Sequence, residues 1–484
     1  MFFVISGFLI TSILLSELAE NKFSIVNFYE RRARRILPAL FIVLFSTYFA
    51  GIIFMPPFEF KEFAQSLVSV VSFLSNVFFY LEIDYFSIAA EEMPLLHTWS
   101  LAIEEQYYIF FPPLLYIVWK INTKLVLTTL VVLTLLSLFS VMLLNSLNNS
   151  SASFYWIISR AWELLAGSIC AYLITFDKFK EKKYLSDIGL LVLLFSFFLW
   201  SNEVIHPGLY TLIPVLATCL IVIFPCKESI SYQSLATPFF VYIGLISYSL
   251  YLWHQPIFSF LRMKSIGPPS EELITIAIVA TFLLAYLTYK YVETPFRNKS
   301  KYSRKFIFTS SSGVLILCCF AGLLGHFSNG FQGRFDFLKS YSTSIQHSPK
   351  RESCHSSSNN YIQPEDSCNY FDGDVSWAVY GDSHVVEPAY ALANIVNEFG
   401  VGLSHHSFSG CPPALNYELK ENELCTKWLN ENLIYLEQNK QVRNVLVGFR
   451  YSSGIFGDNT KFFPYIPEKV LLDIHGSNEF TEQQ

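Results

Sequence analysis

Long hydrophobic stretches follow one another over the first two thirds of the chain, and polar residues prevail in the remainder. A helix that crosses a bilayer needs roughly 20 consecutive, mostly apolar residues. The pattern therefore predicts a multi-span α-helical membrane bundle followed by a soluble part. The candidate spans lie near residues 1–16, 36–55, 62–81, 101–119, 124–144, 158–175, 188–201, 208–226, 241–262, 272–293 and 307–325.

Basic residues between these stretches predict the direction of each helix, because Lys and Arg gather in cytoplasmic loops. The loop 145–153 carries no positive charge and is expected outside. The loops alternate consistently only if 62–81 does not cross completely, so we predict a re-entrant or interfacial segment there. This gives about ten crossings, with residue 1 and the polar part outside the cytoplasm. The basic loops are 22–35, 120–124, 178–183, a weak one at Lys227, and 297–305.

Composition supports the same division of the chain. Of 484 residues, 52% are hydrophobic and 15% are charged, whereas soluble proteins carry about 25% charged residues. Lys and Arg against Asp and Glu give a net charge of +2 through residue 327 and −8 after it. The acidic part argues against nucleic-acid binding, which favours a basic face. We predict a membrane domain at 1–327, a linker or lead-in at 328–372, and a soluble domain at 373–484.

Four cysteines lie in the polar part at short spacings: Cys354, Cys368, Cys411 and Cys425. Their number and spacing suggest disulfides and an oxidising compartment. We favour Cys354–Cys368 and Cys411–Cys425, because short loops close easily, although other pairings are open. Four unpaired thiols in a cytosolic domain are the alternative.

A run of arginines, Arg31, Arg32, Arg34 and Arg35, stands just before an apolar stretch. Guanidinium groups suit phosphates, so the run could clamp a phosphorylated donor at the cytoplasmic face. The alternative is a simple topology anchor.

Two adjacent carboxylates, Glu104 and Glu105, stand a short way into an apolar stretch within His97–Tyr108. Ionisable residues inside a span are costly and are functional candidates by default. As a purely structural alternative, Glu104 could pair with Arg160.

Two more polar groups lie toward the outer ends of predicted spans. Arg160 and Glu163 are spaced i, i+3 and face one way, which suits either a site or a local ion pair. His254 lies among Ser, Tyr, Trp and Gln in Ser247–Pro256 and could relay protons or hold an acceptor hydroxyl. It could also be a hydrogen-bonded core histidine. With the arginine run at the inner face, the arrangement is that of a transferase with its donor inside and its acceptor outside.

These segments occur in the order found in the acyltransferase-3 family, and over nearly all of 1–327 the chain resembles its O-antigen and peptidoglycan O-acetylase branch. The resemblance implies acetyl-coenzyme A, or another acyl-CoA, as cytoplasmic donor, without a metal. It implies transfer to a hydroxyl of a surface glycan, such as lipopolysaccharide O-antigen or peptidoglycan, in a bacterial inner membrane. The matching segments are Phe2–Ile10, Arg31–Pro38, His97–Tyr108, Tyr155–Gly167, Ser247–Pro256 and Tyr291–Arg297.

The resemblance also implies roles for the candidate residues. The arginine run would lie on the coenzyme A side. The polar lining of the transfer path would be Glu104, Glu105, Arg160, Glu163 and His254. In this family the helix before the Phe2–Ile10 motif carries a His and an Arg for transfer, so we expect this chain to lack that first helix.

The polar part resembles the SGNH hydrolases that are fused to this family. An apolar strand at Val375–Tyr380 precedes Gly381-Asp382-Ser383, the first block of those enzymes. The fold class implied is a three-layer α/β domain with a parallel sheet. The resemblance assigns Ser383 as nucleophile and Gly410 as the oxyanion glycine.

The family's Asp-x-x-His, which supplies the base and its orienting group, has no match before the end at Gln484. Asp473 and His475 have the wrong spacing, so we expect a C-terminally incomplete domain. His384 follows Ser383 directly and is not expected to be the base.

Two other functions fit parts of the pattern. A glycan-precursor transporter or flippase would show an inverted repeat with broken helices, which the sequence does not display. A membrane-anchored esterase would act through Ser383, but it would not need so many spans.

Overall fold

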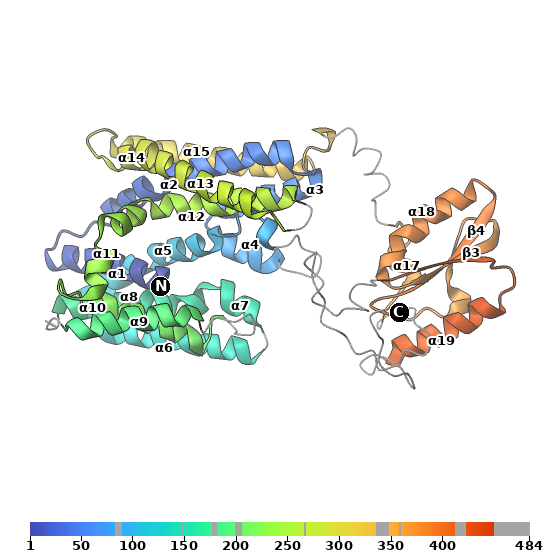
Figure 1. Ribbon diagram of the computed structural model, residues 1–484, viewed down its shortest axis with the longest axis horizontal. Coiled ribbons are helices and arrows are strands. Elements are labelled where there is room, and N and C mark those ends of the chain that lie inside the picture. Colours follow the sequence, from blue (N-terminus) through green and yellow to red (C-terminus); the bar gives the residue numbers. More distant parts are fainter. Residues whose placement is uncertain are drawn as a thin grey trace. The chain divides into compact units, whose positions relative to one another are not determined.

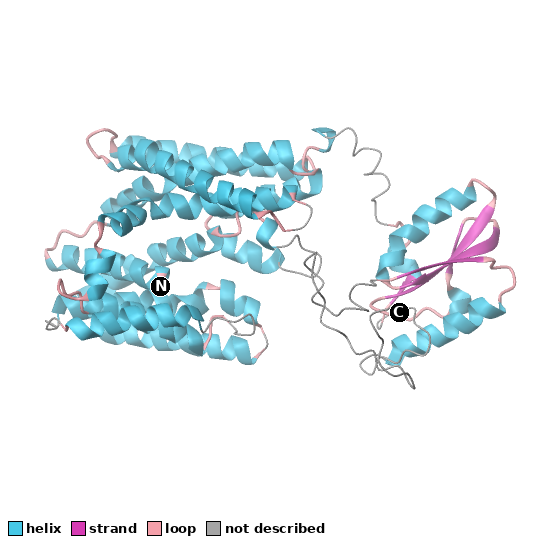
Figure 2. Cartoon of the chain, viewed as in Figure 1, coloured by secondary structure: helices cyan, strands magenta, loops and turns pink. Residues whose placement is uncertain are grey.

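The computed structural model describes residues 1–82, 90–147, 149–176, 182–198, 206–265, 268–334, 348–357, 360–411 and 423–449. The chain divides into two compact units, Met1–Gln332 and Gly333–Gln484. The first is helical and the second contains a sheet (Figures 1 and 2). The predicted fold class, a helical bundle followed by an α/β domain, is confirmed.

Helices fill the first unit, and six of those described are long and apolar enough to cross a membrane. Two other long helices, α5 and α12, are not among these six, because polar side chains interrupt them. The helices other than α3 and α4 are α1 (Phe2–Ala19), α2 (Ile25–Phe54), α5 (Thr98–Ile121), α6 (Leu125–Ser146), α7 (Ser150–Tyr155), α8 (Ile157–Phe176), α9 (Lys183–Phe198), α10 (Leu212–Ile223), α11 (Ile230–Leu235), α12 (Pro238–Lys264), α13 (Glu271–Thr288), α14 (Thr294–Arg297) and α15 (Arg304–Phe327).

The stretch 62–81 does not form one spanning helix, in agreement with the prediction. It belongs to two short helices, α3 (Pro57–Val71) and α4 (Ser75–Glu82). Phe73, in the turn between them, has a φ of 55°, a left-handed conformation that is unusual for a bulky side chain. Gln106 Nε2 on α5 donates a hydrogen bond of 2.8 Å to the Phe73 carbonyl. Neighbouring α5 therefore stabilises the turn.

Two glycines allow α1 and α8 to lie directly against each other. A Cβ at Gly7 would stand 1.9 Å from the carbonyl oxygen of Leu164, and one at Gly167 would stand 1.9 Å from that of Val4. Close contact through small residues is a common way for membrane helices to associate, since lipid provides no hydrophobic drive between them. The contact fixes the position of α1.

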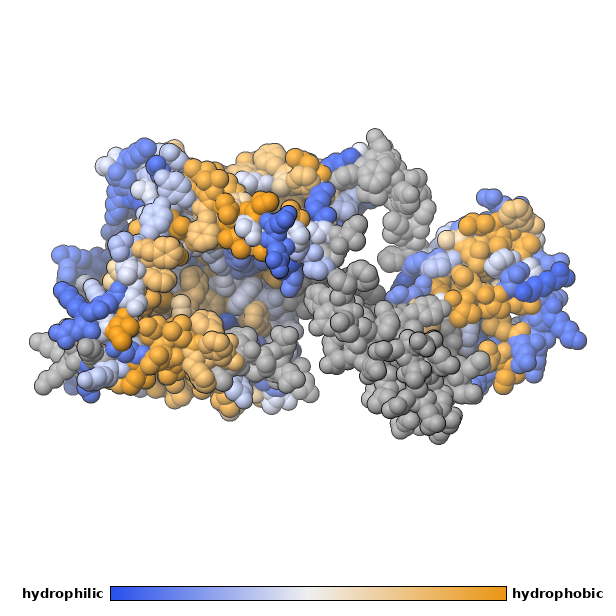
Figure 3. All heavy atoms as spheres, in the orientation of Figure 1, coloured by the Kyte–Doolittle hydropathy of each residue, from blue (hydrophilic) through white to orange (hydrophobic). Residues whose placement is uncertain are grey.

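Large hydrophobic side chains cover much of the outer surface of the helical unit. Exposed residues include Leu191 and Phe195 on α9, and Val279 and Leu283 on α13. Figure 3 shows hydrophobic side chains gathered over these parts of the unit. A soluble protein rarely exposes so large an apolar area, so this surface suits contact with lipid.

The described strands of the second unit form one sheet in the order β1-β4-β3-β5, with β2 also paired to β4. β1, β3 and β5 are parallel to their neighbours, and β2 is antiparallel. Helices α18 and α19 lie on opposite faces of the sheet (Figure 1). The elements are α17 (Arg351–Cys354), β1 (His355–Ser356), β2 (Cys368–Tyr370), β3 (Asp374–Gly381), α18 (Val386–Asn397), β4 (Val401–Phe408), α19 (Glu423–Gln438) and β5 (Asn444–Gly448).

Both favoured disulfides are present. Cys354 is bonded to Cys368, and Cys411 to Cys425, with Cα–Cα distances of 5.3 and 5.6 Å. The first bond joins the last residue of α17, directly before β1, to the first residue of β2. Both strands fall in the range 328–372, which the sequence assigned to a linker or lead-in, and both pair with the sheet.

Candidate active site

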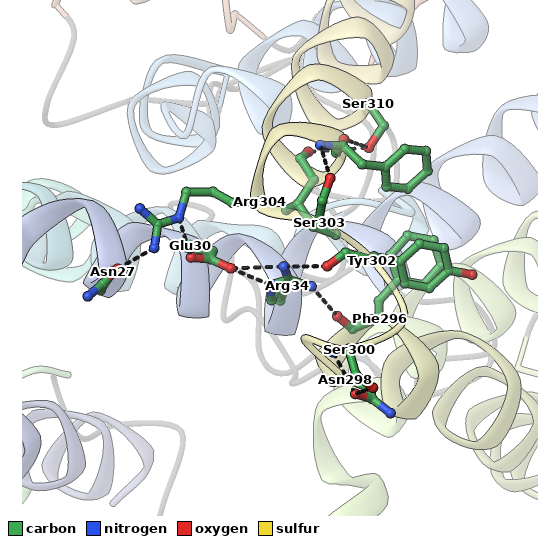
Figure 4. Close-up of polar contacts among 12 residues, drawn as sticks. Asn27, Glu30, Arg34, Phe296, Asn298, Ser300, Tyr302, Ser303, Arg304 and Ser310 are labelled. Carbon is green, nitrogen blue, oxygen red and sulfur yellow. Dashed lines mark hydrogen bonds and ion pairs between the residues drawn. The ribbon is translucent and has the colours of Figure 1, made fainter.

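The arginine run lies on α2, and helical geometry turns its members in different directions. Arg34 is buried, forms an ion pair of 2.8 Å with Glu30, and donates to the carbonyls of Phe296 and Tyr302 at 3.3 and 2.8 Å (Figure 4). Arg304 reaches the other oxygen of Glu30 at 2.7 Å. The Arg34 guanidinium therefore joins α2 to the segment that leads into α15.

The other arginines of the run face different partners. Arg31 forms an ion pair of 2.8 Å with Glu17 on α1. The guanidinium of Arg32 lies 5.8 Å from the centre of the Tyr108 ring on α5. Arg35, three positions further along, shares a helix face with Arg32. Arg32 and Arg35 are thus the members of the run that approach α5.

On α5, Glu104 is buried and Glu105 is partly buried. Arg32 interacts electrostatically with both carboxylates, and Arg35 interacts with Glu104. One carboxylate oxygen of each is buried without a hydrogen-bond partner among the described residues. Next to Glu104, the hydroxyls of Ser6 and Tyr108 are hydrogen-bonded to each other. The structure therefore gathers charged and hydroxyl groups from α1, α2 and α5 inside the helical unit.

His254 lies on α12 beside a second histidine that the sequence reasoning did not single out. The rings of His254 and His97 have centres 5.2 Å apart. The Tyr251 hydroxyl donates to the His97 carbonyl at 2.5 Å and is hydrogen-bonded to Ser100 at 3.0 Å. His97 stands at the start of the apolar stretch that carries Glu104, and that position could have drawn attention to it.

Arg160 and Glu163 form the predicted i, i+3 ion pair, at 2.9 Å. Three aromatic rings surround the Arg160 guanidinium. Their centres lie 5.3 Å (Phe3), 5.4 Å (Trp99) and 5.5 Å (Phe154) from it, which is within the range of cation–π attraction. The rings come from α1, α5 and α7, so this enclosure depends on the tertiary structure.

Glu293 is a further buried carboxylate, and the sequence reasoning gave it no role. It is fully buried, accepts a hydrogen bond from the Ser249 hydroxyl of α12, and forms an ion pair of 2.6 Å with Arg297. Arg297 lies four residues further along the chain and Ser249 lies on α12. Glu293 therefore connects α12 to the segment that follows α13. Its position within the Tyr291–Arg297 motif could have identified Glu293 as a candidate from the sequence.

In the second unit, Ser383 follows β3 at the carboxyl edge of the sheet. Asp382 Oδ1 accepts the N–H of His384 at 2.8 Å, and Ser383 remains partly exposed. Gly410 lies just beyond β4 with a φ of +64°. Because β3 and β4 are parallel neighbours, with Gly381 paired to Ser407, the two predicted positions share one edge. Asp473 and His475 lie outside the described residues.

Two buried histidines, His405 and His406, lie on β4 and point to opposite faces of the sheet. Burial lowers the pKa of His405 to about 3, with a further contribution from neighbouring His355. Burial likewise lowers the pKa of His406 to about 4, although its hydrogen bond to Asn432 opposes the shift. Both rings are therefore neutral at physiological pH.

Comparison with known proteins agrees with this arrangement. Residues 1–290 match the acyltransferase domain family, and residues 353–481 match the SGNH domain that is fused to such domains. The chain belongs to the acyltransferase-3 family. Since the matched part is helical and apolar, the protein is a multi-pass membrane protein.

Its curated relatives include O-acetyltransferases of Staphylococcus aureus. The O-acetyltransferase OatA of strain NCTC 8325 is 31% identical over 316 residues, covering 62% of this chain and 52% of OatA. A protein of strain COL, provisionally named an O-acetyltransferase, is 32% identical over 327 residues, with the same coverage. The chain thus matches about half the length of these relatives. No solved structure matches it significantly.

Proposed function

We propose that this protein is an O-acyltransferase that moves an acyl group, most simply acetyl, from cytoplasmic acyl-CoA to a hydroxyl of a surface glycan. The family membership and the O-acetyltransferase names of its relatives support this proposal. The observation that carries it is the cluster of Arg32, Glu104 and Glu105 in an apolar helical unit, in which Glu104 is buried and the other two are partly buried. Charges in such a place cost stability and are retained for function.

Each group in the helical unit has a chemical task under this proposal. Arg32 and Arg35 would bind the phosphates of the acyl-CoA donor from the cytoplasmic side. Glu105 or His254 would take the proton of the attacking hydroxyl, since a positioned carboxylate or imidazole is a common general base. The enclosed Arg160 would help to hold the acceptor near the outer face.

The second unit would stand outside the cytoplasm, in the periplasm if the host has an outer membrane. Its two disulfides support this placement, because such bonds persist in oxidising compartments. The acceptor would be lipopolysaccharide O-antigen, peptidoglycan or another envelope glycan. Ser383 would then act on the acyl group at that face.

The test is transfer of label from acetyl-labelled coenzyme A to glycan in membrane vesicles that contain the full chain. We expect ester-linked, alkali-labile label in the glycan fraction of wild-type vesicles. Glu105→Gln should lower the rate about 100-fold or more, because it removes a general base or its partner. Glu91→Gln is the matched control, since Glu91 forms only a partly exposed ion pair with Arg262.

Unlabelled glycan in wild-type vesicles would contradict the proposal, and so would equal rates in Glu105→Gln and wild type. Movement of unmodified glycan across the membrane without transfer of label would favour the transporter. Loss of label from pre-acetylated glycan would favour the esterase.

A further inference from the structure

A serine and a histidine meet at the carboxyl edge of the sheet, apart from Ser383. Ser409 Oγ lies 2.8 Å from His355 Nε2, and His355 Nδ1 lies 2.8 Å from Ser407 Oγ. The strands bring them together, because β1 pairs with β4 so that His355 stands opposite Ser407. Hydroxyl, imidazole and a third group that orients the ring are the parts of a nucleophile–base pair.

The hydrogen bonds continue into the interior of the domain. Ser407 Oγ lies 2.7 Å from His405 Nε2, His405 Nδ1 lies 3.1 Å from the Tyr370 hydroxyl, and that hydroxyl lies 3.1 Å from Ser348 Oγ. The Ser348 N–H donates to the Glu387 carboxylate at 2.7 Å. Each side-chain group from Ser407 to Ser348 can donate one hydrogen bond and accept another along this line, whereas the link to Glu387 comes from the Ser348 backbone.

The proposal uses one direction of these hydrogen bonds, in which the hydrogens point toward the interior of the domain. Tyr370 then donates toward Ser348, His405 toward Tyr370, and Ser407 toward His405. His405 can accept from Ser407 because burial lowers its pKa to about 3 and keeps the ring neutral. His355 then donates from Nδ1 to Ser407, and its Nε2 lone pair faces Ser409.

Ser409 itself is suitably placed to react. It is exposed and follows the last residue of β4, at a turn whose next residue is Gly410. Its N–H is bonded to the Ser356 carbonyl at 2.9 Å, which fixes the turn to β1. Gly410 adopts a φ of +64°, and no described residue accepts a hydrogen bond from its N–H. A free N–H directly after a serine nucleophile is a usual oxyanion donor.

We propose that Ser409 and His355 form a second acyl-accepting site in this domain, with Gly410 N–H as an oxyanion donor and Ser407 as a positioning residue. The substrates would be small acyl esters. This goes beyond the proposed function, because it concerns a serine other than Ser383 and does not depend on the helical unit.

The step balances without any further reactant. Ser409 Oγ forms a bond to the acyl carbon while its proton passes to His355 Nε2. The bond to the ester's leaving oxygen then breaks, and His355 returns the proton to that oxygen. An incoming hydroxyl reverses the sequence: it gives its proton to His355, takes the acyl group, and leaves Ser409 with its proton restored.

The experiment uses the full chain in detergent with diisopropyl fluorophosphate, followed by removal of the reagent, chymotrypsin digestion and mass spectrometry. Chymotrypsin cleaves after Tyr380 and Phe408, so Ser383 and Ser409 fall on different peptides. We expect an adduct on Ser409 in wild type and in Ser383→Ala. His355→Ala should slow that labelling about 100-fold or more, the usual contribution of a general base.

Two controls separate chemistry from folding. Ser353 is exposed, but its Oγ is bonded to the Lys350 carbonyl instead of a histidine, so it should stay unlabelled. Protection of the Cys411–Cys425 disulfide from reductant shows that a variant is folded. The proposal is overturned if Ser409 is unlabelled in wild type, or if His355→Ala labels it at the wild-type rate in a folded domain. Neither result depends on transfer from acyl-CoA.

Discussion

Arg32 and Arg34 stand two positions apart on α2 and have opposite surroundings. Arg34 is held by Glu30 and two carbonyls, whereas Arg32 faces an aromatic ring and the Glu104 and Glu105 carboxylates of α5. In the sequence, both residues belong to one run of arginines, and nothing there distinguishes their roles. The neighbours of each side chain divide the run into a structural member and candidates for donor binding.

We expect Arg34→Gln to lower the free energy of unfolding by about 3 kcal/mol, because it leaves Glu30 buried with only the half-exposed Arg304 as a charged partner. Arg32→Gln should cost less stability and yet abolish transfer from acyl-CoA. Thermal unfolding in detergent, measured alongside transfer, checks both. Equal stability of Arg34→Gln and wild type would contradict the structural role of Arg34.

The buried histidines of β4 predict that acid destabilises the second unit. In the unfolded chain a histidine has a pKa near 6.5, and burial lowers the pKa of His405 to about 3 and that of His406 to about 4. The unfolded state therefore takes up protons first. The stabilisation is complete above pH 6.5 and is lost as the pH falls toward 4 and then 3, by roughly 1.4 kcal/mol per pH unit for each ring.

Pulse proteolysis of the full chain at several pH values, read out on fragments of the second unit, measures this loss. His406→Gln should reduce the slope of stability against pH between 6.5 and 4. His384→Gln is the control, because that ring is half exposed. A slope that does not change in His406→Gln would refute the assignment.

At the level of elements, contacts between backbones decide how the helices assemble. Gly7 and Gly167 bring α1 against α8, and this contact places Ser6 beside Glu104 and Phe3 beside Arg160. The turn between the short helices α3 and α4 is held by Gln106 of α5. The candidate site thus depends on packing between helices that are far apart in the sequence.

We expect Gly167→Ala to impair assembly of the helical unit, because the new Cβ would stand 1.9 Å from a backbone oxygen that cannot move aside cheaply. Gly313→Ala is the matched control on α15, since a Cβ at that position would meet no described atom within 4 Å. Yield of monodisperse protein in detergent and its thermal unfolding compare the two. Similar behaviour of both variants would show that α1 and α8 do not pack as described.

For the whole molecule, the proposed function requires a defined topology. Basic loops, uncharged loops and disulfides all support the proposed placement of the second unit outside the cytoplasm. The helical unit and the α/β unit are separate compact bodies. Transfer from a donor inside to an acceptor outside therefore requires that the helical unit crosses the membrane in the proposed direction and that the α/β unit lies outside.

Cysteine labelling in intact cells tests this topology. A cysteine at Ser150, in the uncharged loop region, should react with a membrane-impermeant maleimide, and a cysteine at Asn122 should react only after permeabilisation. Both positions are exposed, whereas the described native free cysteines are buried or partly buried. The reverse labelling pattern would place Ser383 in the cytosol and remove the basis for transfer across the membrane.

The sequence alone determined those features of this protein that depend on residues close together along the chain. Hydrophobic length predicted the bundle, since about 20 apolar residues suit a bilayer, and the break at 62–81 followed from charge alternation. Short cysteine spacing predicted both disulfides. The Arg160–Glu163 pair and the strand before Ser383 followed from the same kind of local pattern.

Only the tertiary structure decided which side chains meet. It turned Arg34 away from Arg32, placed His97 beside His254, enclosed Arg160 in aromatic rings, and lined up Ser409 with His355. The physical reason is that most of these contacts join segments far apart in the sequence, from 54 residues for His355 and Ser409 to 268 residues for Arg34 and Tyr302. Helix packing and strand register fix such contacts, and neither can be read from spacing along one segment.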